Sequence, residues 1–146
     1  MTDRLVVRKE VRVPRPREEA FRLFTDRIGA WWPTASHSLG GDAVVDVRFG
    51  SGVGDLIVEV RDDGTEVAWG EILAWEPPAR VRVRWAVSSP GPATTWEATF
   101  SAVGDATDLV LEHWGWEAHG DGAEEACASY EEGWSPVLDR YLEAAG

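Results

Sequence analysis

The sequence predicts an α+β fold in which a curved antiparallel sheet packs against one long C-terminal helix. Between about residues 43 and 116, apolar and polar residues alternate in short segments that glycine- and proline-rich turns separate, as in antiparallel strands. From about residue 123 the apolar period lengthens from two residues to about 3.6, which indicates a helix. Nine tryptophans supply large apolar side chains for the surface between sheet and helix.

The N-terminal region predicts one strand and two short helices. Residues 4–13 alternate between valine and charged residues, and Pro14 ends this strand because proline has no backbone N–H to donate. Residues 17–26 carry one apolar stripe and acidic residues in the first turn, which favours a short helix. A second helical turn is expected at residues 30–32, and a polar loop follows over residues 33–41.

Six further strands follow, so the predicted sheet has about seven. Asp62-Asp63-Gly64 is a strong hairpin signal, because Asp-Gly supplies the positive φ angles of tight turns. Successive strands with such short connections form an antiparallel meander. The expected strands are residues 43–49, 55–61, 66–75, 80–87, 96–100 and 107–116.

The C-terminal segment predicts a helix of about 20 residues, between about residue 123 and about residue 145. At 1.5 Å per residue it is about 30 Å long, and its apolar stripe needs the apolar face of the sheet as a partner. The stripe consists of Cys127, Tyr130, Trp134, Val137, Leu138, Tyr141 and Leu142.

Composition narrows the classes of function. The 146 residues suit a single domain spanning residues 1–146, and the net charge of −12 opposes nucleic-acid binding, which needs a basic surface. The sequence shows no membrane-length apolar run and no signal-peptide core, so we expect a cytoplasmic protein without membrane contact. One cysteine excludes an internal disulfide. The spacing of His37, His113 and His119 does not suit a zinc site, and we expect no metal and no cofactor.

Three segments, VRVPRPREEAFRLFTDRIGAWW, GEILAWEPPARVRVRW and EEGWSPVLDRYL, resemble in order the family of proteins similar to the activator of heat-shock-protein-90 ATPase. This family belongs to the START-like SRPBCC superfamily. The resemblance implies a helix-grip fold, with a seven-stranded sheet around the C-terminal helix and a cavity between them. It also implies an apolar small-molecule ligand, and for some members a cyclisation or dehydration of that ligand.

Candidate catalytic residues are few. His113 is in phase with two leucines of its strand, so we interpret it as a core or cavity-wall histidine with a hydrogen-bond partner rather than as a base. Glu112 should lie on the opposite face from His113, which excludes an acid–base pair. Glu71 and Glu97 are expected to face water, as most carboxylates on strands do. We therefore predict no catalytic residue.

The leading hypothesis is a protein that binds an apolar or aromatic small molecule in the cavity, with a role in the stress response. The alternatives are a co-chaperone-like protein that binds a chaperone and a cyclase or dehydratase with His113 or a cavity carboxylate as its base. We expect a monomer or a homodimer. The expected cavity wall combines aromatic side chains with a few polar groups: Phe24, Trp32, Trp69, Trp85, Trp96, His113, Tyr130, Trp134 and Val137.

Overall fold

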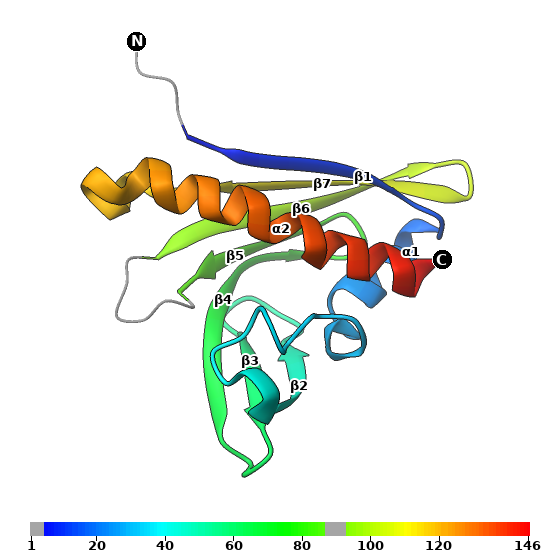
Figure 1. The fold of residues 1–146 in the computed structure, drawn as a ribbon. Coiled ribbons are helices and arrows are strands. Elements are labelled where there is room, and N and C mark those ends of the chain that lie inside the picture. The colour runs from blue at the N-terminus through cyan, green and yellow to red at the C-terminus, as the bar shows by residue number, and fades with distance from the viewer. Residues whose placement is uncertain (1–4, 87–92) are drawn as a thin grey trace.

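One antiparallel sheet of seven strands wraps against a long C-terminal helix in the computed structural model, which describes residues 5–86 and 93–146 (Figure 1). The strands lie in the order β1-β7-β6-β5-β4-β3-β2. They are β1 (Val7–Val13), β2 (Val44–Phe49), β3 (Leu56–Arg61), β4 (Glu66–Glu76), β5 (Arg80–Trp85), β6 (Thr94–Val103) and β7 (Ala106–Trp114). The helices are α1 (Arg17–Phe24), α2 (Ala123–Ala145) and the short 3-10 helices η1 (Ile28–Ala30), η2 (Gly41–Ala43) and η3 (Trp116–Gly122).

The helix-grip fold predicted from the sequence is confirmed. Helix α2 lies along one face of the sheet, α1 lies near its C-terminal end, and strands β2, β3 and β4 curl toward the same side (Figure 1). Within the part of the chain that the structure describes, no helix is long and apolar enough to cross a membrane. The expected strand residues Arg4 and Val87 lie outside the described residues.

The sheet curves because its ladders are irregular at three places. Register shifts occur at residues 44–46 in β2, at 57–58 in β3 and at 72–74 in β4, and such bulges bend and twist a strand. Gly70, inside β4, allows a close approach to β5. A Cβ atom there would lie 2.5 Å from the carbonyl oxygen of Arg84, so a side chain would push the strands apart.

The last strand is shorter than predicted. We expected it to reach about residue 116, but β7 ends at Trp114. Gly115 has a φ of +94°, which turns the chain out of the sheet direction. The turn places Trp116 in η3, fully buried, where its indole N–H donates to the carbonyl oxygen of His113 over 3.0 Å.

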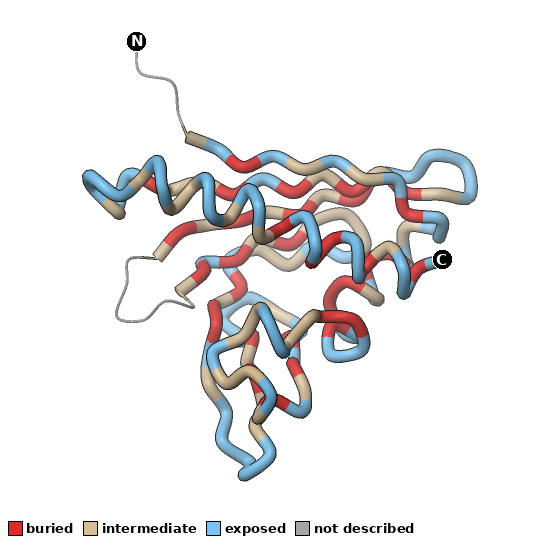
Figure 2. The backbone as a smooth tube through the Cα atoms, in the orientation of Figure 1, coloured by how far each residue is buried: buried red, intermediate tan, exposed pale blue. Residues whose placement is uncertain are grey.

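Aromatic side chains fill most of the space between sheet and helix. Figure 2 shows buried positions alternating with exposed ones along the strands, as expected for a sheet with one covered face. The ring centroid of Trp96 lies 5.9 Å from that of Trp85 and 5.7 Å from that of Trp134. Both pairs are in the edge-on arrangement that aromatic rings favour. Trp96 therefore links β5, β6 and α2 in one packed core.

His113 joins α2 to the sheet through two hydrogen bonds. The indole N–H of Trp134 donates to Nδ1 over 3.0 Å, and Nε2 lies 2.7 Å from the hydroxyl oxygen of Thr94. Because Nδ1 accepts, the proton of the neutral ring must be on Nε2, which then donates to Thr94. Burial lowers the pKa of His113 to about 3. The histidine is a neutral structural link, as the sequence interpretation favoured.

His113 should make the protein sensitive to mild acid. In the unfolded chain its pKa is near the ordinary 6.5, and in the folded chain it is about 3, so the unfolded state takes up the proton first. Its contribution to the free energy of unfolding is fully present above the unfolded value. That contribution is lost by up to about 1.4 kcal/mol per pH unit as the pH falls below it.

Urea unfolding of the parent and of His113→Gln, from about pH 7.5 to about pH 5, measures this slope. The variant should be less stable at neutral pH but should show a shallower dependence on pH. An equal slope in both proteins would contradict the assignment.

Candidate functional site

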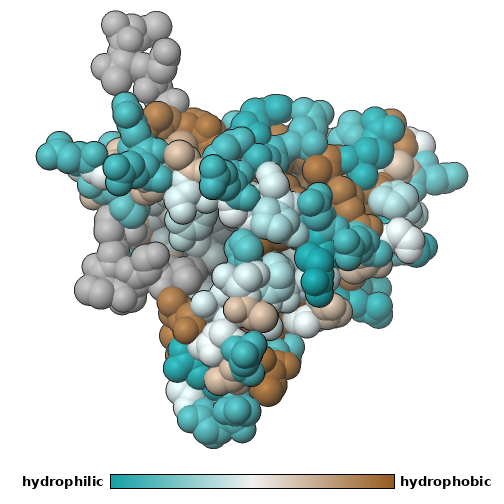
Figure 3. Space-filling model, in the orientation of Figure 1, coloured by the Kyte–Doolittle hydropathy of each residue, from teal (hydrophilic) through white to brown (hydrophobic). Residues whose placement is uncertain are grey.

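A pocket of about 290 Å³ lies between the loop after η1 and the middle of α2. The loop contributes the segment from Trp32 to Ser38, β5 contributes its last tryptophan, and α2 contributes one face. Hydrophilic side chains cover the outward side of α2 (Figure 3). The pocket wall itself is largely apolar. The lining residues are Trp32, Ser36, His37, Ser38, Trp85, Ser129, Tyr130, Gly133, Trp134 and Val137.

The structure brings five of the residues selected from the sequence into this wall: Trp32, Trp85, Tyr130, Trp134 and Val137. The other four lie in the packed core rather than in the wall of this pocket: Phe24, Trp69, Trp96 and His113, each 2% exposed or less. Trp69 lies directly behind the pocket, with its ring centroid 5.2 Å from that of Trp32. Contact of these four residues with a ligand stays a prediction.

The sequence interpretation did not select His37, although its imidazole lines the pocket. Its Nδ1 lies 2.7 Å from the hydroxyl oxygen of Ser36. A Cβ atom added to Gly133 of α2 would lie 3.9 Å from Nε2, so this nitrogen faces the helix across the pocket. The backbone is fixed on both sides, because the His37 N–H donates to the Pro33 oxygen over 2.9 Å and its carbonyl oxygen accepts from Trp32 over 2.7 Å.

Two buried indole N–H groups beside the pocket have no acceptor among the described residues. They belong to Trp85, which lines the pocket and is 5% exposed, and to Trp96 behind it, which is 2% exposed. A buried donor without a partner costs about 1–3 kcal/mol, so most buried polar groups in proteins are paired. Among the described residues, nothing accepts from the Trp85 N–H, so this donor remains available.

The buried carboxylate of Glu59 holds the pocket loop against the sheet. One oxygen accepts the backbone N–H of Leu39 over 2.9 Å and the indole N–H of Trp69 over 2.8 Å, and the other accepts the Arg61 guanidinium over 2.8 Å. Burial alone would raise the pKa of Glu59, but these hydrogen bonds outweigh it and hold the pKa below its ordinary value. The sequence interpretation missed Glu59.

The other acidic residues considered from the sequence lie outside this wall. Glu112 is exposed and His113 is buried, so the prediction that they lie on opposite faces is confirmed. Glu97 pairs with the guanidinium groups of Arg80 and Arg82, at 2.7 and 3.3 Å. Glu71 is half-buried. The described residues contain no cluster of three or more His, Cys, Asp or Glu that could hold a metal ion.

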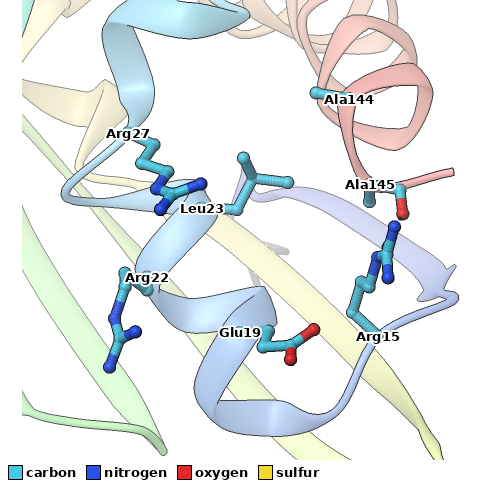
Figure 4. A pocket seen from close by; sticks show the side chains of 7 residues that line it. All are labelled: Arg15, Glu19, Arg22, Leu23, Arg27, Ala144 and Ala145. Atoms are coloured by element: carbon cyan, nitrogen blue, oxygen red, sulfur yellow. Dashed lines mark hydrogen bonds between the residues drawn. The ribbon is translucent and has the colours of Figure 1, made fainter.

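Two larger hollows, of about 360 Å³ each, flank α1, and the first of them suits ligand binding less well. Figure 4 shows the first, where Arg15 points to the Ala145 carbonyl, Arg22 points away from it, and Glu19 lies between. Arg15 already donates to that carbonyl over 2.7 Å. Because its charged side chains are solvated, this hollow lacks the dry, mostly apolar wall typical of small-molecule sites. The second hollow lies between Phe21 and the Pro77-Pro78 turn.

Replacing Glu59 by leucine should loosen the pocket loop. The change removes a buried charge partner and leaves three donors without their acceptor, so the free energy of unfolding should fall by about 3–5 kcal/mol. Chemical unfolding measures this loss, and faster amide hydrogen exchange at Leu39 would locate it. Glu112→Leu, an exposed carboxylate on β7, is the matched control and should change stability by about 0.5 kcal/mol or less.

The pH dependence gives a second test of Glu59. Its contribution is present above the ordinary pKa of 4.5 and is lost as the pH falls through the lower, folded value. This loss begins near the ordinary pKa of 4.5, below the range of about pH 7.5 to about pH 5 in which His113 is tested, and it should be absent from Glu59→Leu. A variant within about 1 kcal/mol of the parent would show that the carboxylate does not anchor the loop.

Solved structures share the fold over nearly the whole chain. An anthrahydroquino-γ-pyrone synthase, Txn09, solved in complex with a ligand designated SUM, is 34% identical, with a TM-score of 0.66 over 98% of this chain and 99% of that one. Protein MLL2253 from Mesorhizobium loti is 20% identical, with a TM-score of 0.67 over 94% of both chains. DynU16, a putative protein of the dynemicin biosynthetic locus, is 23% identical, with a TM-score of 0.72 over 97% of this chain and 47% of that one.

A protein-family model also matches most of the sequence. No curated protein matches the chain. The model for Activator of Hsp90 ATPase homolog 1-like protein matches residues 14–145, which include α1, the last six strands and α2. The three segments that suggested this resemblance lie almost entirely within the match. The chain therefore belongs to the family of Activator of Hsp90 ATPase homolog 1-like proteins.

Proposed function

We propose that this protein binds an apolar or aromatic small molecule in the pocket between the Trp32–Ser38 loop and α2. The observation that carries the proposal is the wall itself: three indoles line about 290 Å³, and the N–H of one of them, Trp85, has no acceptor among the described residues. Apolar walls with a few placed polar groups are typical of small-molecule sites. Flat aromatic ligands stack well on such indoles.

A second candidate is an enzyme that closes a ring on an aromatic substrate in the same pocket. It is favoured by the 34% identity to a γ-pyrone synthase across almost all of both chains and by a histidine in the wall. From the sequence, the base of such an enzyme was expected to be His113 or a cavity carboxylate. Because His113 is buried, neutral and bonded at both ring nitrogens, His37 is the better candidate.

Other expectations from the sequence stay predictions. They are a chaperone partner, a role in the stress response, a cytoplasmic location, a monomeric or dimeric state, and a single domain over residues 1–146.

Ligand binding can be tested by tryptophan fluorescence with tricyclic aromatic ketones and, for comparison, fatty acids. Stacking on Trp32, Trp85 and Trp134 should give saturable quenching with the aromatic ligands. Gly133→Leu is the blocking variant. Glycine inside a helix costs about 1 kcal/mol relative to alanine or leucine, so this change should leave the fold at least as stable while filling the pocket.

The variant should weaken binding by at least about tenfold, which is about 1.4 kcal/mol. Ala128→Leu, an exposed position on the same helix outside the pocket lining, should bind like the parent. Equal affinities of all three proteins would place the ligand elsewhere. Absence of quenching by every ligand class would contradict the proposed function.

A further inference from the structure

We propose that the pocket takes a hydroxylated aromatic ketone or quinone and that His37 accepts the proton of its acidic hydroxyl group. The inference rests on the ligand-binding function proposed above and adds the chemistry of the ligand. It comes from the hydrogen bonds of His37 and from the donor that Trp85 leaves unused. Both residues lie in one pocket wall, although they are far apart in the sequence.

One arrangement of the Ser36 hydroxyl group gives His37 the tautomer that can act as a base. The hydroxyl group of Ser36 has a weak contact of 3.4 Å to the carbonyl oxygen of Pro33, to which it donates. The hydroxyl oxygen of Ser36 lies 2.7 Å from Nδ1 of His37. When Ser36 donates to Pro33, this oxygen accepts the proton of Nδ1. With the proton on Nδ1, the neutral ring carries a lone pair on Nε2.

Nε2 faces the space in which a ligand would lie. It lies close to Gly133 of α2, where an added Cβ atom would be at a contact distance of 3.9 Å, so there is room for a single ligand atom between them. The two backbone hydrogen bonds of His37, to Pro33 and from Trp32, fix the residue on the loop. Glu59 in turn fixes the loop through Leu39. The base is therefore held in position before a ligand arrives, which is what proton transfer requires.

No other group in the wall competes for this role. The ten lining residues include no carboxylate, lysine or arginine, and Tyr130 is the one ionisable residue among them besides His37. A tyrosine hydroxyl can hydrogen-bond a ligand oxygen, but it is a poor proton acceptor. An acidic hydroxyl on the ligand thus has one basic partner in the wall, the imidazole.

The proposed step balances within the ligand and one side chain. The ligand O–H bond breaks, an N–H bond forms at Nε2, and the electron pair stays on the ligand oxygen, from which it spreads to the conjugated carbonyl oxygen. The imidazolium keeps its Nδ1–H bond to Ser36. The indole N–H of Trp85 is the available donor for the carbonyl oxygen. The resulting charge pair is attractive, because the imidazolium and the ligand oxygen lie next to each other.

Alizarin, a dihydroxyanthraquinone, is a suitable probe, because its absorption moves to longer wavelength when a hydroxyl group ionises. At neutral pH, binding of alizarin should quench the tryptophan fluorescence of the parent. The bound alizarin should contain more of the ionised form than free alizarin does. His37→Gln should still quench, but its bound alizarin should show an ionised-to-neutral ratio about tenfold lower, the size expected from losing one charge partner. Ser36→Ala should give an intermediate ratio, because the orientation of the ring is lost but the base remains.

His119→Gln is the matched control, since this histidine lies in η3 outside the pocket lining, and it should behave like the parent. Quenching with the same spectrum in the parent and in His37→Gln would overturn the proton transfer but leave ligand binding intact. Absence of quenching in the parent by alizarin and by every other aromatic ketone would overturn both. A thermal melt close to that of the parent shows that each variant is folded.

Discussion

The pocket depends first on the buried carboxylate of Glu59. A charge without solvent exposure is stable in a protein only when donors replace the lost water, and here three donors do so from the loop, from β3 and from β4. The bond to the Leu39 N–H ties an otherwise polar loop to the sheet. The His37 side of the pocket therefore has a fixed position, although it belongs to no long helix or strand.

The opposite wall depends on a neutral polar link. Trp134 of α2 donates to His113 of β7, which also bonds Thr94 of β6, so this buried link helps to fix the position of the helix along the sheet. Apolar contacts are not directional. Hydrophobic packing therefore holds a helix against a sheet, but it determines the position of the helix along the sheet less well. A charged link in the loop wall and an uncharged link in the helix wall thus define the distance between His37 and Gly133.

The sequence could predict the fold because strand and helix periods report which face of an element is covered. The same parity could not report depth: Trp85 and Trp96 were both assigned to the apolar face, but one lines the pocket and the other packs behind it. Glu59 was missed because β3 has apolar residues on both faces, with Val58 and Val60 alternating with the buried Ile57. His37 was missed as a pocket residue because its position depends on the Glu59 anchor, which no local pattern of the loop reveals.

The features that lower the stability of this fold lie in or beside the pocket. Gly133 lies inside α2, where a glycine lowers the stability of a helix by about 1 kcal/mol relative to alanine. The unpaired indole N–H groups of Trp85 and Trp96 cost about 1–3 kcal/mol each. Such sums are large beside the 5–15 kcal/mol that typically separates folded from unfolded domains. Several unfavourable features at one place, such as a glycine inside a helix and buried donors without acceptors, are more typical of a functional site than of imperfect packing. A ligand with an oxygen acceptor would satisfy the donor in the wall, occupy the space that the glycine leaves and exclude water from His37. The ligand-binding site proposed above would account for these separate departures from good packing together.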